Sequence, residues 1–181
     1  GAVGFIARVI APFFSRIFPG VPKDHPATGH MVMNFSANML GLDNAATPFG
    51  LKAMESLQEL NPNKDEASDA QIMFLVIQTS GLTVIPLSIM AQRAILGAAD
   101  PSDVFIPCLI ATYISTLVGI ITVSIRQRIN LFHPVVLAWL GGGTAVIGGL
   151  VWYIAEFMSK PEIELMSKVS ANLILFSIIV T

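Results

Sequence analysis

Three amides, one carboxylate and two hydroxyls interrupt the otherwise apolar stretch MVMNFSANMLGLDNAATPFG. The amides belong to Asn34, Asn38 and Asn44, the carboxylate to Asp43 and the hydroxyls to Ser36 and Thr47. An amide both donates and accepts hydrogen bonds, and the spacing of Asn34 and Asn38 puts them on one face of a helix. Such side chains can bind the polar groups of a solute. A carboxylate beside them can hold a cation or a proton.

A second polar stretch, QTSGLTVIP, interrupts a later apolar segment in the same way. Gln78, Thr79, Ser80 and Thr83 bring one amide and three hydroxyls, and Pro86 follows them. A pair of apolar segments interrupted by Gly or Pro is a strong sequence indication of a transporter's binding site. We therefore expect the two stretches to face each other and to line one polar site.

Each of these residues also has a purely structural explanation. Hydroxyl and small side chains let membrane helices pack closely, and an Asn can bond across helices for structure alone. Asp43 is the strongest single candidate for a functional residue, because burying an acid inside a membrane is costly and such an acid usually has a function. Its alternative is solvation at the interface, or capping of the helix that follows. The two stretches taken together favour the functional interpretation.

No catalytic arrangement stands out elsewhere in the sequence. His25, His30 and His133 each adjoin Pro or Gly, which is typical of loops and interfaces, and Cys108 is the single cysteine. The run GGGTAVIGG lacks the strand–helix context and the Lys of a phosphate-binding loop, so close helix packing explains it better. We expect no enzyme activity, no metal site and no cofactor.

The composition fits a membrane better than water. Of the 181 residues, 54% are hydrophobic and 12% are charged, whereas a soluble domain carries about 25% charged residues. The net charge of −2 gives no basic surface for nucleic acid. We expect an all-α, polytopic integral membrane protein with broken or re-entrant helices, and a lipid bilayer as its surroundings.

The breaks follow from the backbone chemistry of the first stretch. Pro48 lacks a donor and disfavours helix at Thr47, while Gly41 and Gly50 make breaks easy. Non-helical backbone at membrane depth is tolerated only inside protein or along a wet cavity. The sequence therefore predicts that residues 41–50 do not form one continuous helix. The other expected elements are apolar segments over 4–22, 29–47, 70–96, 103–125, 131–158 and from 169, with a polar loop over 55–69.

Charge placement predicts how these segments are arranged. Short loops rich in Lys and Arg lie in the cytoplasm, so Arg126 and Arg128 place their loop inside. Counting back, the acidic stretch 48–69 is also inside. A segment 29–47 that crossed the membrane would then put the basic N-terminal end outside, against the rule. The pattern favours a re-entrant hairpin instead.

The same two stretches resemble a known family. DHPATGHMVMNFSANMLGLDNAATPFGLKAME, followed by QTSGLTVIP, resembles the bacterial spore maturation protein A family, whose members carry the nucleoside recognition, or Gate, domain. NAATP and GLKAME match the family pattern, whereas Asp43 stands where a Gly is expected and Gln78 where an Asn is expected. The resemblance covers residues 1–127. Residues 128–181 are expected to hold an additional membrane helix and the start of a spore maturation protein B-like unit.

The resemblance implies a multi-pass protein of the bacterial cytoplasmic (inner) membrane that acts as a transporter or transport gate for a small polar solute, with nucleosides as one candidate. The alternative is a non-transporting membrane scaffold in spore or envelope maturation. Expected partners are the solute, the bilayer and the B-like half, and homo-oligomers are left open. Because the last apolar run is too short to span a bilayer, we expect the chain to be part of a longer protein. The residues expected to bind the solute are Asn34, Asn38, Asp43, Asn44, Thr47, Gln78, Thr79, Ser80 and Thr83.

Overall fold

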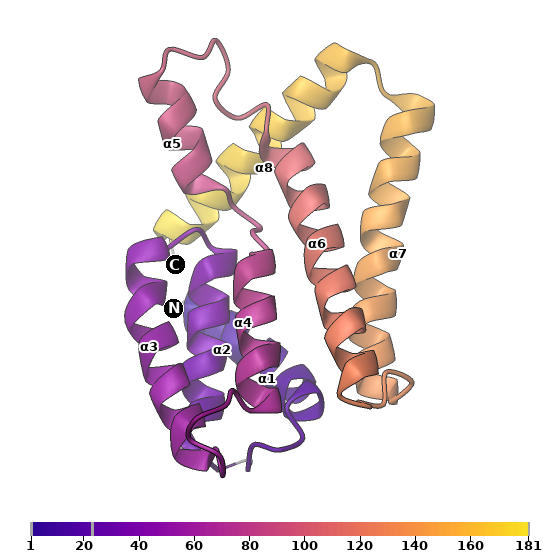
Figure 1. Ribbon diagram of the computed structural model, residues 1–181. Coiled ribbons are helices and arrows are strands. Elements are labelled where there is room, and N and C mark those ends of the chain that lie inside the picture. The colour runs from indigo at the N-terminus through magenta and orange to yellow at the C-terminus, as the bar shows by residue number, and fades with distance from the viewer. Residues whose placement is uncertain (1, 23, 181) are drawn as a thin grey trace.

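The computed structural model describes the backbone of residues 2–22 and 24–180, and all side chains among them except residues 2, 3, 43, 160 and 174–180. The described part is helical and contains no strand, which confirms the expected all-α class. Figure 1 shows the arrangement. The helices are α1 (Ala2–Ile17), α2 (Pro26–Met39), α3 (Asp43–Leu60), α4 (Asp69–Ser80), α5 (Leu87–Ile95), α6 (Phe105–Arg126), α7 (Pro134–Phe157) and α8 (Lys160–Val180).

Helices α2 and α3 form a hairpin. Helix α2 starts at Pro26, whose missing N–H costs nothing at a helix start, and the His25 ring nitrogen Nδ1 accepts a hydrogen bond from the Ala27 N–H. Only residues 40–42 separate the helices, and Gly41 has a φ of +66°. Both outer ends of the hairpin lie at the same end of the molecule (Figure 1), the geometry of a re-entrant segment.

The break in the first stretch is shorter than the sequence predicted. Residues 41–50 do not form one continuous helix, as predicted, because α3 starts only at Asp43. Helix α3 then continues through Pro48, so the expected loss of helix at Thr47 was wrong. Pro48 lies early in α3, so its missing N–H removes only the helical bond to the carbonyl of Asn44, near the helix start. Helix α3 also extends to Leu60, so the polar loop begins at Asn61 rather than at residue 55.

The second stretch is broken where the sequence predicted. Helix α4 begins with a capping box formed by Ser68 and Gln71. It ends at Gly81, which adopts the left-handed conformation with a φ of +60°. Residues 81–86 are non-helical, and α5 then continues to the opposite end of the molecule (Figure 1). The hairpin turn and this second break lie at the same level, midway between the two ends.

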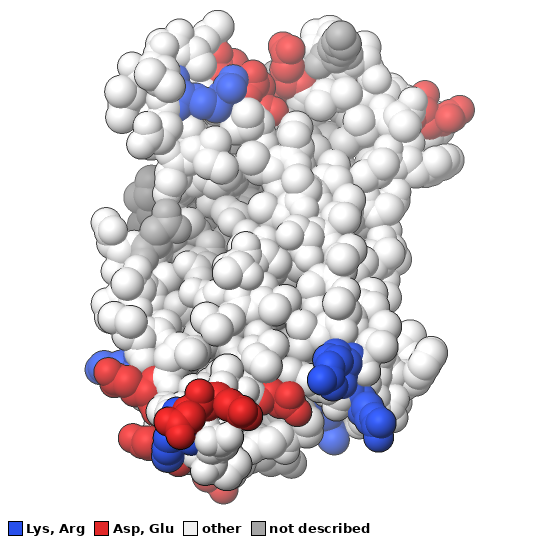
Figure 2. All heavy atoms as spheres, in the orientation of Figure 1, with Lys and Arg blue, Asp and Glu red and all other residues white. Residues whose placement is uncertain are grey.

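Helices α6 and α7, with 22 and 24 residues, are long and apolar enough to cross a membrane. In Figure 2, Lys, Arg, Asp and Glu side chains gather at the two ends, and the face in view between them carries none among the described residues. These features fit an integral membrane protein whose apolar belt meets lipid. Both helix breaks lie at the level of this belt (Figures 1 and 2).

Aromatic side chains of α1 pack against α2 and α7. The rings of Phe14 and Phe35 lie 5.4 Å apart, and those of Phe13 and Trp139 lie 5.9 Å apart, which joins α1 to α2 and α7. The glycine run of α7 contributes less than expected. A Cβ on Gly143 would lie 2.7 Å from the Tyr113 hydroxyl, whereas Cβ atoms on its other glycines would meet no described atom within 4 Å. The expectation of close packing was therefore wrong for most of this run.

Candidate functional site

The two helix breaks pack directly against each other. The carbonyl oxygen of Met39, the last residue of α2, accepts hydrogen bonds from the N–H groups of Val84 (2.8 Å) and Ile85 (3.2 Å). The end of α2 is thus capped by the backbone of the other break. A Cβ on Gly41 would lie 2.4 Å from the Ile85 carbonyl oxygen, so only glycine allows this approach.

An amide pair joins the same elements through side chains. Asn38 of α2 donates from Nδ2 to Oε1 of Gln78 on α4 at 2.8 Å. Both side chains are half-buried. If both amide groups are turned over, Gln78 becomes the donor and Asn38 the acceptor, and the hydrogen bond is preserved. The contact between the two amides therefore does not depend on which of them donates. The structure therefore brings together one predicted residue from each polar stretch.

Asn34 lies one helical turn before Asn38 and is fully buried. Its Nδ2 donates to the carbonyl oxygen of Ala46 on α3 at 2.8 Å. Since a carbonyl can only accept, the amide orientation is fixed, and Oδ1 is left without a described partner. Gly50 makes room for this side chain, because a Cβ there would lie 2.9 Å from Asn34 Nδ2. We call Asn34, Asn38 and Gln78 the amide cluster.

A cleft opens beside the breaks. A cavity of about 350 Å³ is lined by Gly41, Leu42, Asn44, Ala45 and Ser88. A smaller cavity of about 130 Å³ shares Gly41 and Ser88 with it. We call these two cavities the break cleft.

Two helices start at the break cleft. Helix α3 starts at Asp43 and α5 at Leu87, each without a hydrogen bond from a capping side chain. Backbone N–H groups at helix starts carry a positive partial charge and attract oxygen-bearing or anionic groups. The break cleft therefore offers both an amide side chain, from Asn44, and helix-start donors to a polar molecule.

Helix α6 contacts the second break through hydroxyl groups. Ser80 Oγ donates to Thr116 Oγ1 at 3.0 Å, and the Thr83 N–H donates to Thr112 Oγ1 at 3.3 Å. Sequence reasoning missed both α6 residues. Their i, i+4 spacing within an apolar helix was the available signal, since it places two hydroxyls on one face.

The remaining predicted residues do not join the amide cluster. Thr79 is exposed, and its hydroxyl donates to the Leu75 carbonyl of its own helix at 2.9 Å, so it does not join the amide cluster. Asn44 and Thr47 are exposed on the first turns of α3. The side chain of Asp43 lies outside the described residues.

The described residues at these breaks do not form a metal site. No group of three or more His, Cys, Asp or Glu side chains that could hold a metal ion is found there. His30 instead makes a 3.1 Å hydrogen bond with Ser56, between α2 and α3. The described groups at the breaks are amides, hydroxyls and backbone donors, which suit hydrogen bonding of a polar solute.

Comparison with known proteins shows the family of the chain. The family model described as nucleoside recognition (Gate) matches residues 1–96, which include both breaks. Spore maturation protein A of Bacillus subtilis (strain 168) is 44% identical over 121 residues, which cover 67% of this chain and 62% of that protein. The aligned part thus spans less than two thirds of that relative's length. No solved structure matches the chain. The chain therefore belongs to the nucleoside recognition (Gate) family.

Proposed function

We propose that the protein is a multi-pass transporter or transport gate of the bacterial inner membrane, and that a small polar solute binds at the two packed breaks. One observation carries this proposal: two interrupted segments meet at mid-depth beside a cleft that contains an amide and two helix starts. Discontinuous helices at the membrane midplane are a recurring construction of transporter binding sites. Membership in the Gate family supports the same assignment.

The contacts suggest how such a site would work. The Met39–Val84 and Asn38–Gln78 bonds hold the breaks together. A solute that offers donors and acceptors can replace the amide bond without leaving polar groups unpaired, which would be costly at this depth. Asn44 is placed to contact a solute in the break cleft, and Asp43 would bind a coupling cation or proton. Nucleosides are one candidate solute, because the family description names them.

The orientation follows from charge. Arg126 and Arg128 would lie in the cytoplasm, because short basic loops do so. The α2–α3 hairpin then enters from the cytoplasm and returns, while α4 and α5 together cross the membrane around the second break. We further propose that residues 1–127 form the Gate unit and that residues 128–181 add a membrane helix and begin a spore maturation protein B-like half. No interaction with nucleic acid is part of this proposal.

A thermal-shift screen of the full-length protein in detergent tests the proposal. Nucleosides, nucleobases, small anions and divalent cations form the panel. A ligand that binds only the folded state stabilises it by about 2.7 kcal/mol at a hundred times its dissociation constant. We expect a shift that Asn44→Ala removes. The matched control is Asn172→Ala, which changes an exposed amide on α8 and should keep the shift. A panel without any shift would contradict the proposal.

A membrane scaffold is the second candidate function, and one observation favours it. Asn34 and Asn38 both use their amide groups in hydrogen bonds between helices, as structural amides do. Open glycines on α7 would let a partner helix approach closely. A scaffold requires no hydrated cleft, so water access to Asn44 separates the two functions.

A further inference from the structure

Two arginines at the lower end of α6 have no described partner. Arg126 and Arg128 are exposed, and neither makes an ion pair or side-chain hydrogen bond within the part of the chain that is described. Gln127, between them, donates to the Asp69 backbone carbonyl and holds this turn against the start of α4. In Figure 2 the lower end carries mainly acidic side chains at its left and centre, while basic side chains gather at its right, at the edge of the apolar belt.

Arg128 occupies a position that favours glycine. It is the single described non-glycine residue with a positive φ, at 57°. The bonds from Ile129 N–H to the Ser124 carbonyl and from Arg128 N–H to the Ile125 carbonyl close a Schellman turn, where glycine is usual at this position. The left-handed conformation costs free energy for any residue with a Cβ. A strained position that carries an unpaired guanidinium indicates that the charge itself is used.

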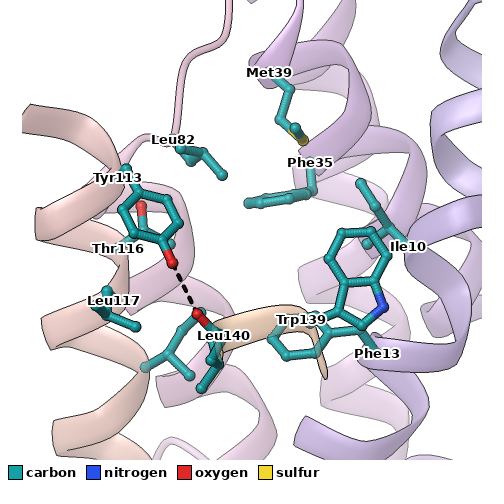
Figure 3. Close-up of a pocket in the computed structure, with 11 residues that line it drawn as sticks. Ile10, Phe13, Phe35, Met39, Leu82, Tyr113, Thr116, Leu117, Trp139 and Leu140 are labelled. Atoms are coloured by element: carbon teal, nitrogen blue, oxygen red, sulfur yellow. Dashed lines mark hydrogen bonds between the residues drawn. The ribbon is translucent and has the colours of Figure 1, made fainter. Parts of the chain in front are cut away.

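An apolar groove rises from this end of α6. It consists of a cavity of about 80 Å³ (Figure 3) and an open cavity of about 550 Å³ that share Met39, Leu82, Tyr113 and Trp139 as walls. Along α6 the walls run from Ile120 to Leu109, which is about 16 Å at 1.5 Å per residue. That length is roughly half of a 30 Å hydrocarbon core, or one leaflet. Arg126 lies about 9 Å beyond Ile120 by the same rise.

Tyr113 and Thr116 carry the hydroxyl groups of the groove wall, and both contact polar groups of the protein. The Tyr113 hydroxyl is bonded to the Leu140 carbonyl at 3.0 Å, as Figure 3 shows, and Thr116 accepts from Ser80. Apart from these hydroxyls and the Trp139 indole, the walls are apolar side chains and glycines, so the groove suits an apolar occupant. Because the groove lies in the belt that meets lipid, hydrocarbon is the apolar material present at that depth.

We propose that this groove and the arginine pair bind one anionic phospholipid, with an acyl chain between α1, α6 and α7 and the phosphate at Arg126 and Arg128. Arg16 adds a third charge, because it lies one turn beyond Phe13, which lines the groove on α1. Basic pockets between membrane helices on the cytoplasmic side recognise anionic headgroups in this way. This site is separate from the break cleft.

Lipid titration of the full-length protein in detergent tests the proposal. Phosphatidylglycerol and phosphatidylcholine with identical acyl chains are compared by native mass spectrometry and by unfolding temperature. We expect tighter binding and a larger temperature shift for phosphatidylglycerol. Replacing the charges in Arg126→Gln/Arg128→Gly should weaken phosphatidylglycerol binding by about tenfold to thirtyfold. Glycine suits the left-handed turn, so this variant keeps its fold. Arg8→Gln, on the exposed face of α1, should leave binding unchanged.

A second pair of variants tests the groove. Gly142 lines it, whereas its neighbour Gly141 does not, and a Cβ on either would meet no described atom within 4 Å. Gly142→Leu should therefore fill the groove and abolish the phosphatidylglycerol shift, while Gly141→Leu should keep it. Equal binding of the two lipids by the unaltered protein, or a phosphatidylglycerol preference that survives loss of both arginines, would overturn the proposal.

Discussion

Asn38 and Gln78, forty residues apart in the sequence, are joined by a 2.8 Å hydrogen bond between their side-chain amides. Asn38 lies in the last turn of α2, the first helix of the hairpin, and Gln78 lies just before the second break. The Met39 carbonyl also accepts hydrogen bonds from the backbone N–H groups of Val84 and Ile85. These bonds together couple the two interrupted segments into one structure. The proposed site depends on that coupling.

A double-mutant cycle on Asn38→Ala and Gln78→Ala should reveal the coupling directly. Each single change leaves one amide without its partner, and the double change removes both. We expect a coupling energy of about 0.5–1.5 kcal/mol, the range found for interhelical bonds in membrane proteins. SDS-induced unfolding of the full-length protein measures it. Strictly additive effects would show that the bond does not join the breaks.

Gly41→Ala should destabilise the protein severely. The added Cβ would lie 2.4 Å from the Ile85 carbonyl oxygen, and φ at this position is +66°. Strain and overpacking together predict a loss of about 2–4 kcal/mol. The control is Gly29→Ala, in α2, where a Cβ meets no described atom within 4 Å. There alanine should stabilise the helix by about 0.5–1 kcal/mol. Similar unfolding curves for both variants would disprove the close contact of the breaks.

The stabilisation that Ser102 gives to the loop between α5 and α6 should decrease at acidic pH. Its hydroxyl, and next its backbone N–H, donate to Asp100 at 2.6 Å and 3.0 Å and lower the pKa of that carboxyl below its ordinary value of 3.8. A lowered pKa stabilises the fold above the ordinary value, and this stabilisation is lost as pH falls through the folded-state pKa.

The measurement is the unfolding temperature of Ser102→Ala and of the unaltered protein across pH. We expect a constant difference above about pH 5 that shrinks as the pH falls below the ordinary value for Asp. A difference that stays constant down to pH 2 would mean that the hydrogen bond from the Ser102 hydroxyl does not favour the charged carboxylate.

The sequence predicted the helical class, both breaks and the meeting of the two polar stretches, because glycines and polar residues are rare in apolar helices. It did not predict which side chains pair. Gln78, Thr79 and Ser80 are consecutive, so successive side chains on α4 point about 100° apart and cannot share one face. Gln78 therefore meets Asn38, Ser80 meets Thr116, and Thr79 bonds to its own helix.

Two further differences have local causes. Pro48 looked like a helix stop, yet early in a helix proline removes just one backbone bond, near the exposed start. The glycines of α7 looked like a packing face, but within the described chain Gly143 alone approaches another helix, at Tyr113. Periodicity shows that a face can pack closely; it does not show which neighbour reaches it.

Water access to the break cleft tests the central claim most directly. Single cysteines at Asn44→Cys and Ser88→Cys, in a Cys108→Ala background, are treated with a charged thiol reagent in membrane vesicles. Asn63→Cys in the exposed polar loop sets the upper limit of reactivity, and Val118→Cys on the exposed apolar face of α6 sets the lower limit. The reagent needs water and thiolate. A transport site predicts that both cleft cysteines react nearly as fast as the loop position. Reactivity as low as that at Val118 would contradict a polar site at the breaks and favour the scaffold.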